Sequence, residues 1–249
     1  MNALAAPQSA KPALARPGIE GAAAFAALAR QHLGAPSSWL DRHVVSESLA
    51  LCVIEAAQAT CSGFATVCSV IDRYQEYQRT KGEPGPDSLR DLLETFDAVG
   101  GPSIWAGKVG NFRRRYTGDG PTVCAAGIFH VADSFYRLGV STTTDLAATA
   151  VRPAWRSKVR DAWRCGLGDP SERSWHHLLA LTCPTDPALE RAAAQTLLTH
   201  AAVSVPVDFD STAALLGVRA GTLRFAIIRW YLCDAAAGIK EPAPRLSAI

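Results

Sequence analysis

The sequence has few of the features that mark membrane, secreted or metal-binding proteins. No apolar run reaches the roughly 18–20 residues that a membrane-spanning helix needs, so we expect no membrane association. Residues 1–17, rich in alanine and proline, lack the continuous apolar core of a signal peptide, and we expect a disordered tail there. The seven cysteines form no Cys-x-x-Cys pair, which argues against a disulfide framework or a zinc knuckle. We therefore expect a protein of the reducing cytoplasm with no bound metal.

Charge is also scarce. Charged residues make up 19% of the chain and the net charge is +2, which is not the signature of a strongly basic nucleic-acid-binding protein. Any nucleic-acid surface must therefore come from local clustering of lysine and arginine. Hydrophobic residues reach 48%, and alanine, the best helix former, is abundant, so these numbers favour a packed helical protein.

Apolar residues recur at spacings of three and four along most of the chain, which is the period of a helix packed on one side. Prolines and glycines separate these segments, and no convincing two-residue alternation occurs; Pro206 makes residues 204–209 a linker rather than a strand. We expect eight to eleven short helices and an all-α fold, with residues 18–249 forming one compact unit. The predicted helices include residues 18–34, 46–60, 63–79, 87–99, 121–139, 152–164, 187–202 and 212–237, the last broken at Gly217 and Gly221.

Residues 49–60 (LALCVIEAAQAT) resemble the opening core helix of the endonuclease III branch of the helix-hairpin-helix DNA glycosylase superfamily, which ends in a similar Ala-Gln-Ala-Thr. Residues 109–137 resemble the family segment that precedes its hairpin. The resemblance implies an all-α fold with two helical lobes and a cleft between them. It also implies that Gln58 lies at the DNA-facing end of its helix, where it helps to fill the gap left by an extruded base.

Residues 159–175 (VRDAWRCGLGDPSERSW) resemble the helix-hairpin-helix of that family, which we place at about residues 152–186. Gly166-Leu167-Gly168 stands for the Gly-apolar-Gly turn, whose backbone amides approach a DNA phosphate closely. This is the densest basic stretch of the chain, so a local DNA-binding patch is expected. The resemblance assigns DNA contacts here to Arg160, Arg164, Gly166, Leu167, Gly168 and Arg173.

The family places its essential aspartate near the start of the helix after the hairpin, and Asp186 stands there. The resemblance implies that Asp186 stabilises positive charge on the sugar, or activates water, while the glycosidic bond breaks. No lysine occupies the nucleophile position and the four cluster-binding cysteines are missing, so a monofunctional glycosylase without a cofactor is expected. Its partner is double-stranded DNA and we expect a monomer.

Each assigned residue also has an ordinary structural interpretation. Asp186 before Pro187 suits a helix cap, the glycines suit a helix end, and Gln58 suits the polar end of a helix. Arg113, Arg114 and Arg115 fit a solvated loop, Trp155, Trp163 and Trp175 fit packing, and His176 and His177 cannot both face one way along a helix. Two alternatives therefore stand: a catalytically inactive DNA-binding protein of the same fold, or a helical module that binds a protein or a small molecule.

Overall fold

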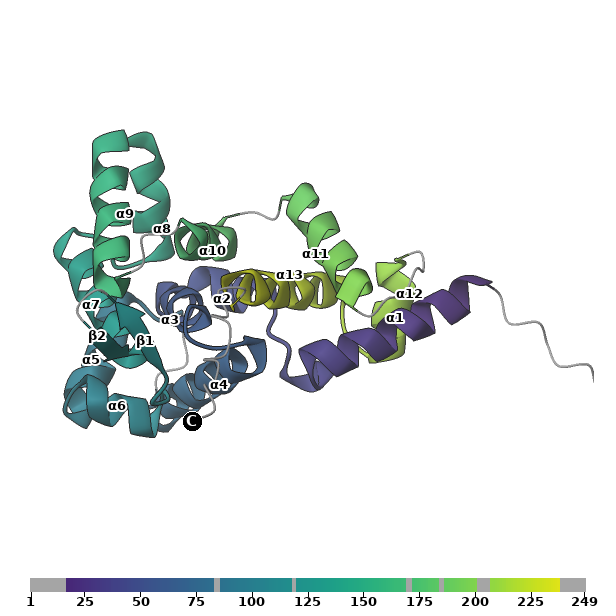
Figure 1. The fold of residues 1–249 in the computed structure, drawn as a ribbon, viewed down its shortest axis with the longest axis horizontal. Coiled ribbons are helices and arrows are strands. Elements are labelled where there is room, and N and C mark those ends of the chain that lie inside the picture. Colours follow the sequence, from purple (N-terminus) through teal and green to yellow (C-terminus); the bar gives the residue numbers. More distant parts are fainter. Residues whose placement is uncertain are drawn as a thin grey trace, which may run out of the picture.

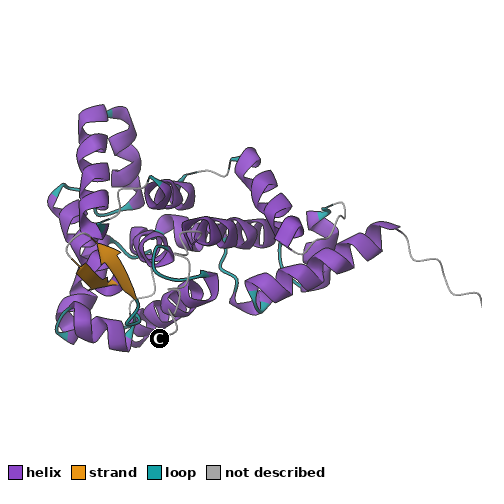
Figure 2. Cartoon of the chain, viewed as in Figure 1, coloured by secondary structure: helices purple, strands orange, loops and turns teal. Residues whose placement is uncertain are grey.

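The structure is a computed structural model that describes residues 17–82, 86–117, 120–168, 172–183, 186–200 and 207–237. These residues form thirteen α-helices, two single 3-10 turns and one short β-hairpin, so the predicted all-α class is confirmed (Figures 1 and 2). The predicted disordered tail falls almost entirely outside the described residues, since α1 begins at Pro17.

The elements follow one another along the chain with short connections. They are α1 (Pro17–Leu33), α2 (Arg42–Glu47), α3 (Leu49–Ala59), α4 (Phe64–Thr80), α5 (Leu89–Val99), α6 (Pro102–Lys108), β1 (Arg114–Thr117), β2 (Gly120–Val123), α7 (Cys124–Arg137), α8 (Thr143–Ala148), α9 (Pro153–Leu167), α10 (Arg173–Thr182), α11 (Pro187–His200), α12 (Phe209–Leu216) and α13 (Ala220–Ala237). The strands pair antiparallel, with Arg114 opposite Val123.

The helices form two groups that share α13. In one group α7 packs on α3, α5 and α9, and α10 packs on α3; in the other, α1 packs on α12, and both α11 and α12 pack on α13. Helix α13 runs through the middle of the molecule and also contacts α3, α4 and α10, as Figure 1 shows. Elements from the middle and the end of the chain are thereby brought against α3.

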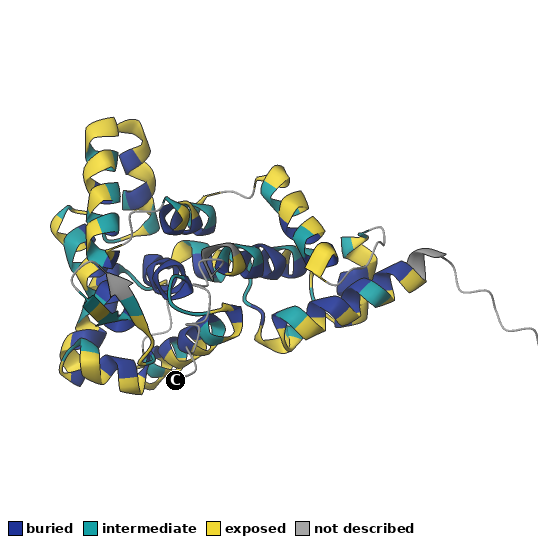
Figure 3. Ribbon diagram, viewed as in Figure 1, coloured by how far each residue is buried: buried dark blue, intermediate teal, exposed yellow. Residues whose placement is uncertain are grey.

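Helix α3 is the centre of the core. The Ser48 side chain caps it by accepting a hydrogen bond from the Leu51 amide, and every residue from Leu49 to Ala59 is buried. Figure 3 shows α3 and much of α13 in the colour of buried residues, whereas the outer sides of α9 and α11 are exposed. Because α3 is enclosed on all sides, its polar residues must find partners inside the protein.

The β-hairpin corrects the sequence analysis, which expected no strand, a helix from residue 121 and a solvated loop at Arg113–Arg115. Strands of four residues are too short for an alternating pattern to stand out, and the helix starts only at Cys124. Helices α2 and α6 were missed for the same reason, since six or seven residues show no apolar stripe. Helix α9 runs to Leu167, three residues further than predicted.

One cysteine pair also departs from expectation. A disulfide joins Cys61, just after α3, to Cys124, the first residue of α7, with 6.6 Å between their Cα atoms. The two residues are 63 positions apart, and no spacing rule identifies such a pair. Cys52 and Cys233 are free and buried and pack as small apolar residues.

No single helix among the described residues is long and apolar enough to cross a membrane.

Candidate functional site

A cleft opens where α2, α10, α11 and α13 meet. One part of it, about 330 Å³ in volume, is lined by residues that include His176, Cys183, Asp186 and Leu232. An adjoining part of about 570 Å³ is lined by residues of α2, α11 and α13 and by Asp41 and Arg219, and five of its eleven lining residues are charged. Arg42 lines both parts, so the two depressions lie next to each other. Clefts of this size accommodate small molecules or a single extruded nucleotide.

Two carboxylates at the start of α11 line the depressions, Asp186 just before the helix and Glu190 within it. Asp186 is exposed and caps the helix, since its Oδ1 accepts a hydrogen bond of 2.8 Å from the Ala188 amide. Glu190 follows one helical turn later, with its side chain 22% exposed and its Oε1 3.5 Å from Nε of Arg224. Because residues four apart share a helix face, both acids point toward the same side of α11. The capping interpretation of Asp186 is therefore confirmed, and the cap holds the carboxylate at the cleft.

Cations face these acids from the other walls. Arg42 spans the end of α10, where its Nη2 donates to the backbone oxygens of Cys183 and, at 3.4 Å, of Ala180. Carbonyls at a helix C-terminus carry partial negative charge, which fixes a guanidinium there. Burial lowers the pKa of Arg42 below its usual range, yet the group remains a cation. Arg219 and Arg224 line the larger part of the cleft.

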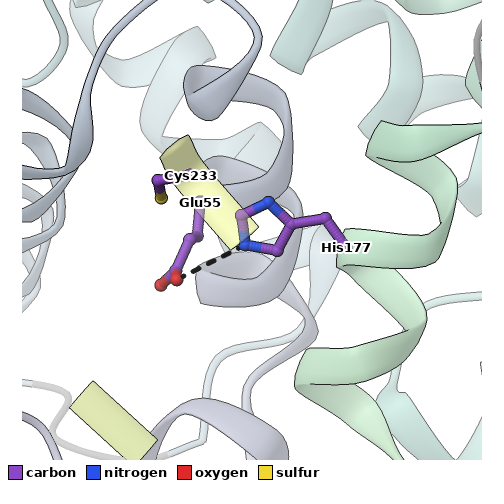
Figure 4. Close-up of side chains that lie close together, drawn as sticks. All are labelled: Glu55, His177 and Cys233. Atoms are coloured by element: carbon purple, nitrogen blue, oxygen red, sulfur yellow. Dashed lines mark ion pairs between the residues drawn. The ribbon is translucent and has the colours of Figure 1, made fainter. Parts of the chain in front are cut away.

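Behind the cleft wall lies a second, fully buried group of polar side chains. Figure 4 shows Glu55 of α3, His177 of α10 and Cys233 of α13 pointing toward one another. The neighbours of two of them in sequence, His176 and Leu232, line the cleft itself. Their ligand atoms lie within 4.8 Å of one another, and none of the three side chains is exposed beyond 1%.

Arg229 of α13 is the main partner of Glu55. Its Nε donates to both carboxylate oxygens, at 3.0 and 2.9 Å, and its Nη2 lies 2.8 Å from Oε2 as an ion pair without hydrogen-bond geometry. Burial pushes the pKa of Glu55 upward, but the charge of Arg229 and its hydrogen bonds outweigh burial, and the pKa ends below its usual value. The same pair raises the pKa of Arg229 despite burial. Both groups are therefore charged inside the core.

The carboxylate, imidazole and thiol of this cluster are ligand types that zinc accepts. Both ring nitrogens of His177 are buried without a hydrogen-bond partner among the described residues, although Nε2 lies 3.6 Å from Oε1 of Glu55. The guanidinium of Arg229 argues against a metal, because its Nε already donates to both carboxylate oxygens of Glu55. Burial also raises the pKa of the Cys233 thiol well above its usual range, which keeps the thiol protonated. We interpret the cluster as an internal ion pair.

Gln58 lies at the end of α3, as the resemblance implied, but its side chain is buried. Its side chain is 1% exposed, and its Nε2 donates to Oγ of Ser62 at 2.8 Å and to Oδ1 of Asn111 at 3.3 Å. The segment after α3 covers the end of the helix, which a sequence pattern of one helix does not reveal. The buried Gln58 side chain braces the segment that contains Asn111.

The predicted glycine turn is also different. Gly166 and Leu167 belong to α9, and Gly168 alone adopts a left-handed conformation, with φ of 58°. The Gly168 amide donates to backbone oxygens of Arg164 and Cys165, so it is engaged within the helix end. Gly166 is required by packing, because a Cβ there would lie 2.8 Å from Cγ2 of Val131 on α7. Leu167 is buried and also packs in the core.

The basic residues of this region lie on one helix face. Arg156, Arg160 and Arg164 follow one another at intervals of four along α9, and Arg173 is exposed at the start of α10. Residues at this spacing form a single stripe, so the predicted local clustering is present in the structure. Arg164 also lies 3.8 Å from Glu172, and both residues are half-buried.

The remaining candidates serve packing. Trp163 donates from Nε1 to Oγ of Ser174 at 3.0 Å, and Trp155 donates to the Leu138 backbone oxygen at 3.1 Å. His176 and His177 face opposite ways, as expected, one into the cleft and one into the core. Sequence reasoning missed four charged residues, because their partners come from distant parts of the chain and form no local motif. These residues are Arg42, Glu55, Glu190 and Arg229.

Comparison with known proteins gives one match. Residues 23–188, about two thirds of the chain, match a protein family described as a domain of unknown function (DUF8548). No curated protein and no solved structure matches the chain.

Proposed function

The chain belongs to the family of the domain of unknown function DUF8548, and we propose that it is a DNA-binding protein that hydrolyses the N-glycosidic bond of a modified base. The observation that carries this proposal is the position of Asp186, which is capped onto α11 and lines a cleft between two groups of helices. This position matches what the sequence resemblance to monofunctional DNA glycosylases implies for the essential aspartate.

Two groups of arginines, one on α9 and α10 and one in the cleft, support binding of a polyanion. The stripe of Arg156, Arg160 and Arg164 on α9, with Arg173 on α10, suits the phosphates of duplex DNA. Arg42, Arg219 and Arg224 line the cleft, where an extruded nucleotide brings one further phosphate. These cations are local, which reconciles DNA binding with a net charge of only +2.

In the proposed reaction, the bond between C1′ of the sugar and the base nitrogen lengthens first. Positive charge develops on the sugar, and the carboxylate of Asp186 stabilises it. The oxygen of a water molecule forms the new bond to C1′ and loses its proton to the carboxylate. The base leaves with the electron pair of the broken bond. No lysine amine takes part, so the DNA strand itself is not cleaved.

The test is base release from a panel of duplexes that each carry one modified base. Asp186→Asn is the decisive variant, because asparagine still caps a helix and the fold is preserved. We expect base release to fall at least 100-fold while DNA affinity changes less than threefold, on the scale of removing a charge-stabilising group. Unchanged turnover in this variant contradicts the assignment of Asp186. Glu190→Gln, measured beside it, tells which of the two cleft acids acts on the sugar.

A second function is favoured by the helix end at Gly168. The Gly168 amide is already engaged and Gly166 lies inside α9, so neither glycine offers a free amide to a phosphate as the glycosylase hairpin requires. A protein that binds DNA but no longer removes bases fits this observation. Salt-dependent DNA binding without base release on any substrate of the panel would select this alternative.

A further inference from the structure

The segment between α6 and β1 is held rigidly from inside. Arg73 of α4 donates from Nε to the Val109 oxygen at 2.9 Å and from Nη2 to the Gly110 oxygen at 2.5 Å. The Gly110 amide donates to the Trp105 oxygen at 2.9 Å. A Cβ at Gly110 would lie 2.6 Å from the Trp105 ring, so the backbone passes directly over this buried side chain.

Asn111 completes the bracing. Its Oδ1 accepts hydrogen bonds from the Arg113 amide at 3.0 Å and from Nε2 of the buried Gln58 at 3.3 Å. The segment therefore has a fixed course on both sides of residue 112. Fixed segments present their exposed side chains without a further loss of conformational freedom on binding.

What this segment presents is an exposed aromatic ring. Phe112 is 66% exposed and its ring lies against the backbone of Gly107, where a Cβ would lie only 3.2 Å from Cζ. Ile104, 49% exposed, precedes Gly107 by one turn of α6. Two large apolar side chains thus lie exposed beside a rigid backbone.

Cations flank Phe112 in the sequence. Lys108, Arg113 and Arg114 are exposed and form no ion pair among the described residues. The sequence contains no aspartate or glutamate between Asp97 and Asp119, although it has four lysine and arginine residues there. An exposed aromatic ring among cations without acids is the composition of surfaces that stack on nucleic-acid bases. We call Ile104, Lys108, Phe112, Arg113 and Arg114 the Phe112 platform.

We propose that the Phe112 platform is a DNA contact in which the ring stacks on an unpaired base while Arg113 and Arg114 bind the adjoining phosphates. This inference rests on the proposed DNA binding and adds a residue that touches the bases. It reassigns Gln58, which acts through Asn111 to position the segment. The binding partner is DNA with a locally opened helix, because only an unstacked base offers its face to a side chain.

The experiment uses the full chain and a duplex that carries a stable abasic analogue with 2-aminopurine opposite to it. Fluorescence anisotropy of an end label reports affinity, and quenching of 2-aminopurine reports stacking. We expect Phe112→Ala to lose about tenfold in affinity, the scale of one base–aromatic contact, together with the quenching. Tyr136→Ala is the matched control, because Tyr136 is 45% exposed and also precedes an arginine in the sequence. This variant should change neither readout.

The double change Arg113→Gln with Arg114→Gln should reduce the slope of log affinity against log salt by about 2.

The outcomes separate the two proposals. If the unaltered chain binds the duplex and Phe112→Ala binds and quenches equally well, the platform is overturned and DNA binding stands. If the unaltered chain shows no salt-sensitive binding, both are overturned. Because Phe112 is exposed, its removal leaves the core intact, and a thermal melt of each variant checks this.

Discussion

The buried cluster and the cleft use the same kinds of side chain in opposite ways. In the cluster, Glu55 and Arg229 are enclosed by α3, α10 and α13, and each satisfies the other. In the cleft, Asp186 accepts from the Ala188 amide and Arg42 donates to backbone oxygens of α10 beside the Phe225 ring, and both residues line a depression. Charges without access to water must be matched within the protein, whereas charges at a cleft remain available to a ligand. The contrast separates a structural centre from the candidate binding site.

The largest effect on stability is expected when the buried pair of Glu55 and Arg229 is broken. Glu55→Gln or Arg229→Met leaves one buried charge without its partner, and each should lower the free energy of unfolding by about 3–5 kcal/mol. Urea denaturation at neutral pH measures this loss. The double variant should lose less than the sum of the two, because it leaves no unpaired charge. Asp186→Asn, the cleft control, should change stability by less than about 0.5 kcal/mol. Equal losses at the two places would contradict the contrast.

Removing the disulfide tests what holds the C-terminal end of α3, which Cys61 follows. Cys61–Cys124 closes a long loop, and in the chain-entropy account such a cross-link stabilises a fold by about 2–4 kcal/mol. Replacing both cysteines by serine should lower stability by that amount in non-reducing buffer. The unaltered protein with a thiol reductant should match the double variant. A variant as stable as the oxidised protein would show that packing alone holds this end.

Smaller losses of stability are expected from changes at the two glycines near the end of α9. Gly166→Ala places a methyl group against Val131 and should cost about 1–3 kcal/mol by overpacking, whereas Gly168→Ala should cost about 1 kcal/mol because its φ is positive. Gly221→Ala, where nothing lies within 4 Å, is the control and should be neutral or slightly stabilising. Weakened DNA binding with unchanged stability in Gly166→Ala would instead support the glycosylase hairpin.

The smallest effect concerns pH. The pKa of Glu55 lies below its ordinary value of 4.5, so its contribution to stability is present above about pH 4.5 and is lost as pH falls through the lower folded-state pKa. Stability of the unaltered protein should therefore fall more steeply in acid than that of Glu55→Gln. Asp41 and Asp145 also have lowered pKa values, but they are present in both proteins and cancel in the difference. Parallel acid titrations of the two proteins would contradict the ionised buried pair.

The sequence predicted the parts of the fold that have strong local signals. Apolar stripes located α1, α3, α4 and α5 to within a few residues, because packing on one side imposes a period that survives in the sequence. The β-hairpin and the helices α2 and α6 are too short to show any period. The turn at Gly168 was placed correctly, but its companion glycine proved to be a packing residue, since a glycine in sequence does not reveal what lies opposite.

The candidate site was predictable only in part. Asp186 was found through resemblance and because an acid before a proline suits a helix start. Glu55 in the middle of an apolar helix was a visible anomaly, yet its partner Arg229 stands 174 positions later, so no local pattern pairs them. Arg42 lies on α2, a helix of six residues that is too short to be predicted from an apolar pattern. Features built from contacts between distant segments need the structure.

The measurement that tests the account most directly is binding of the unaltered protein to a labelled duplex with a stable abasic-site analogue. An undamaged duplex of the same sequence is the control, and both are measured at two salt concentrations. We expect tighter binding to the abasic duplex, because the cleft would accept the extruded nucleotide. We also expect this binding to weaken as salt rises, because the arginines of α9 would bind phosphates. Equal binding to both duplexes, or none to either, would contradict the account and would leave Asp186 as a helix cap.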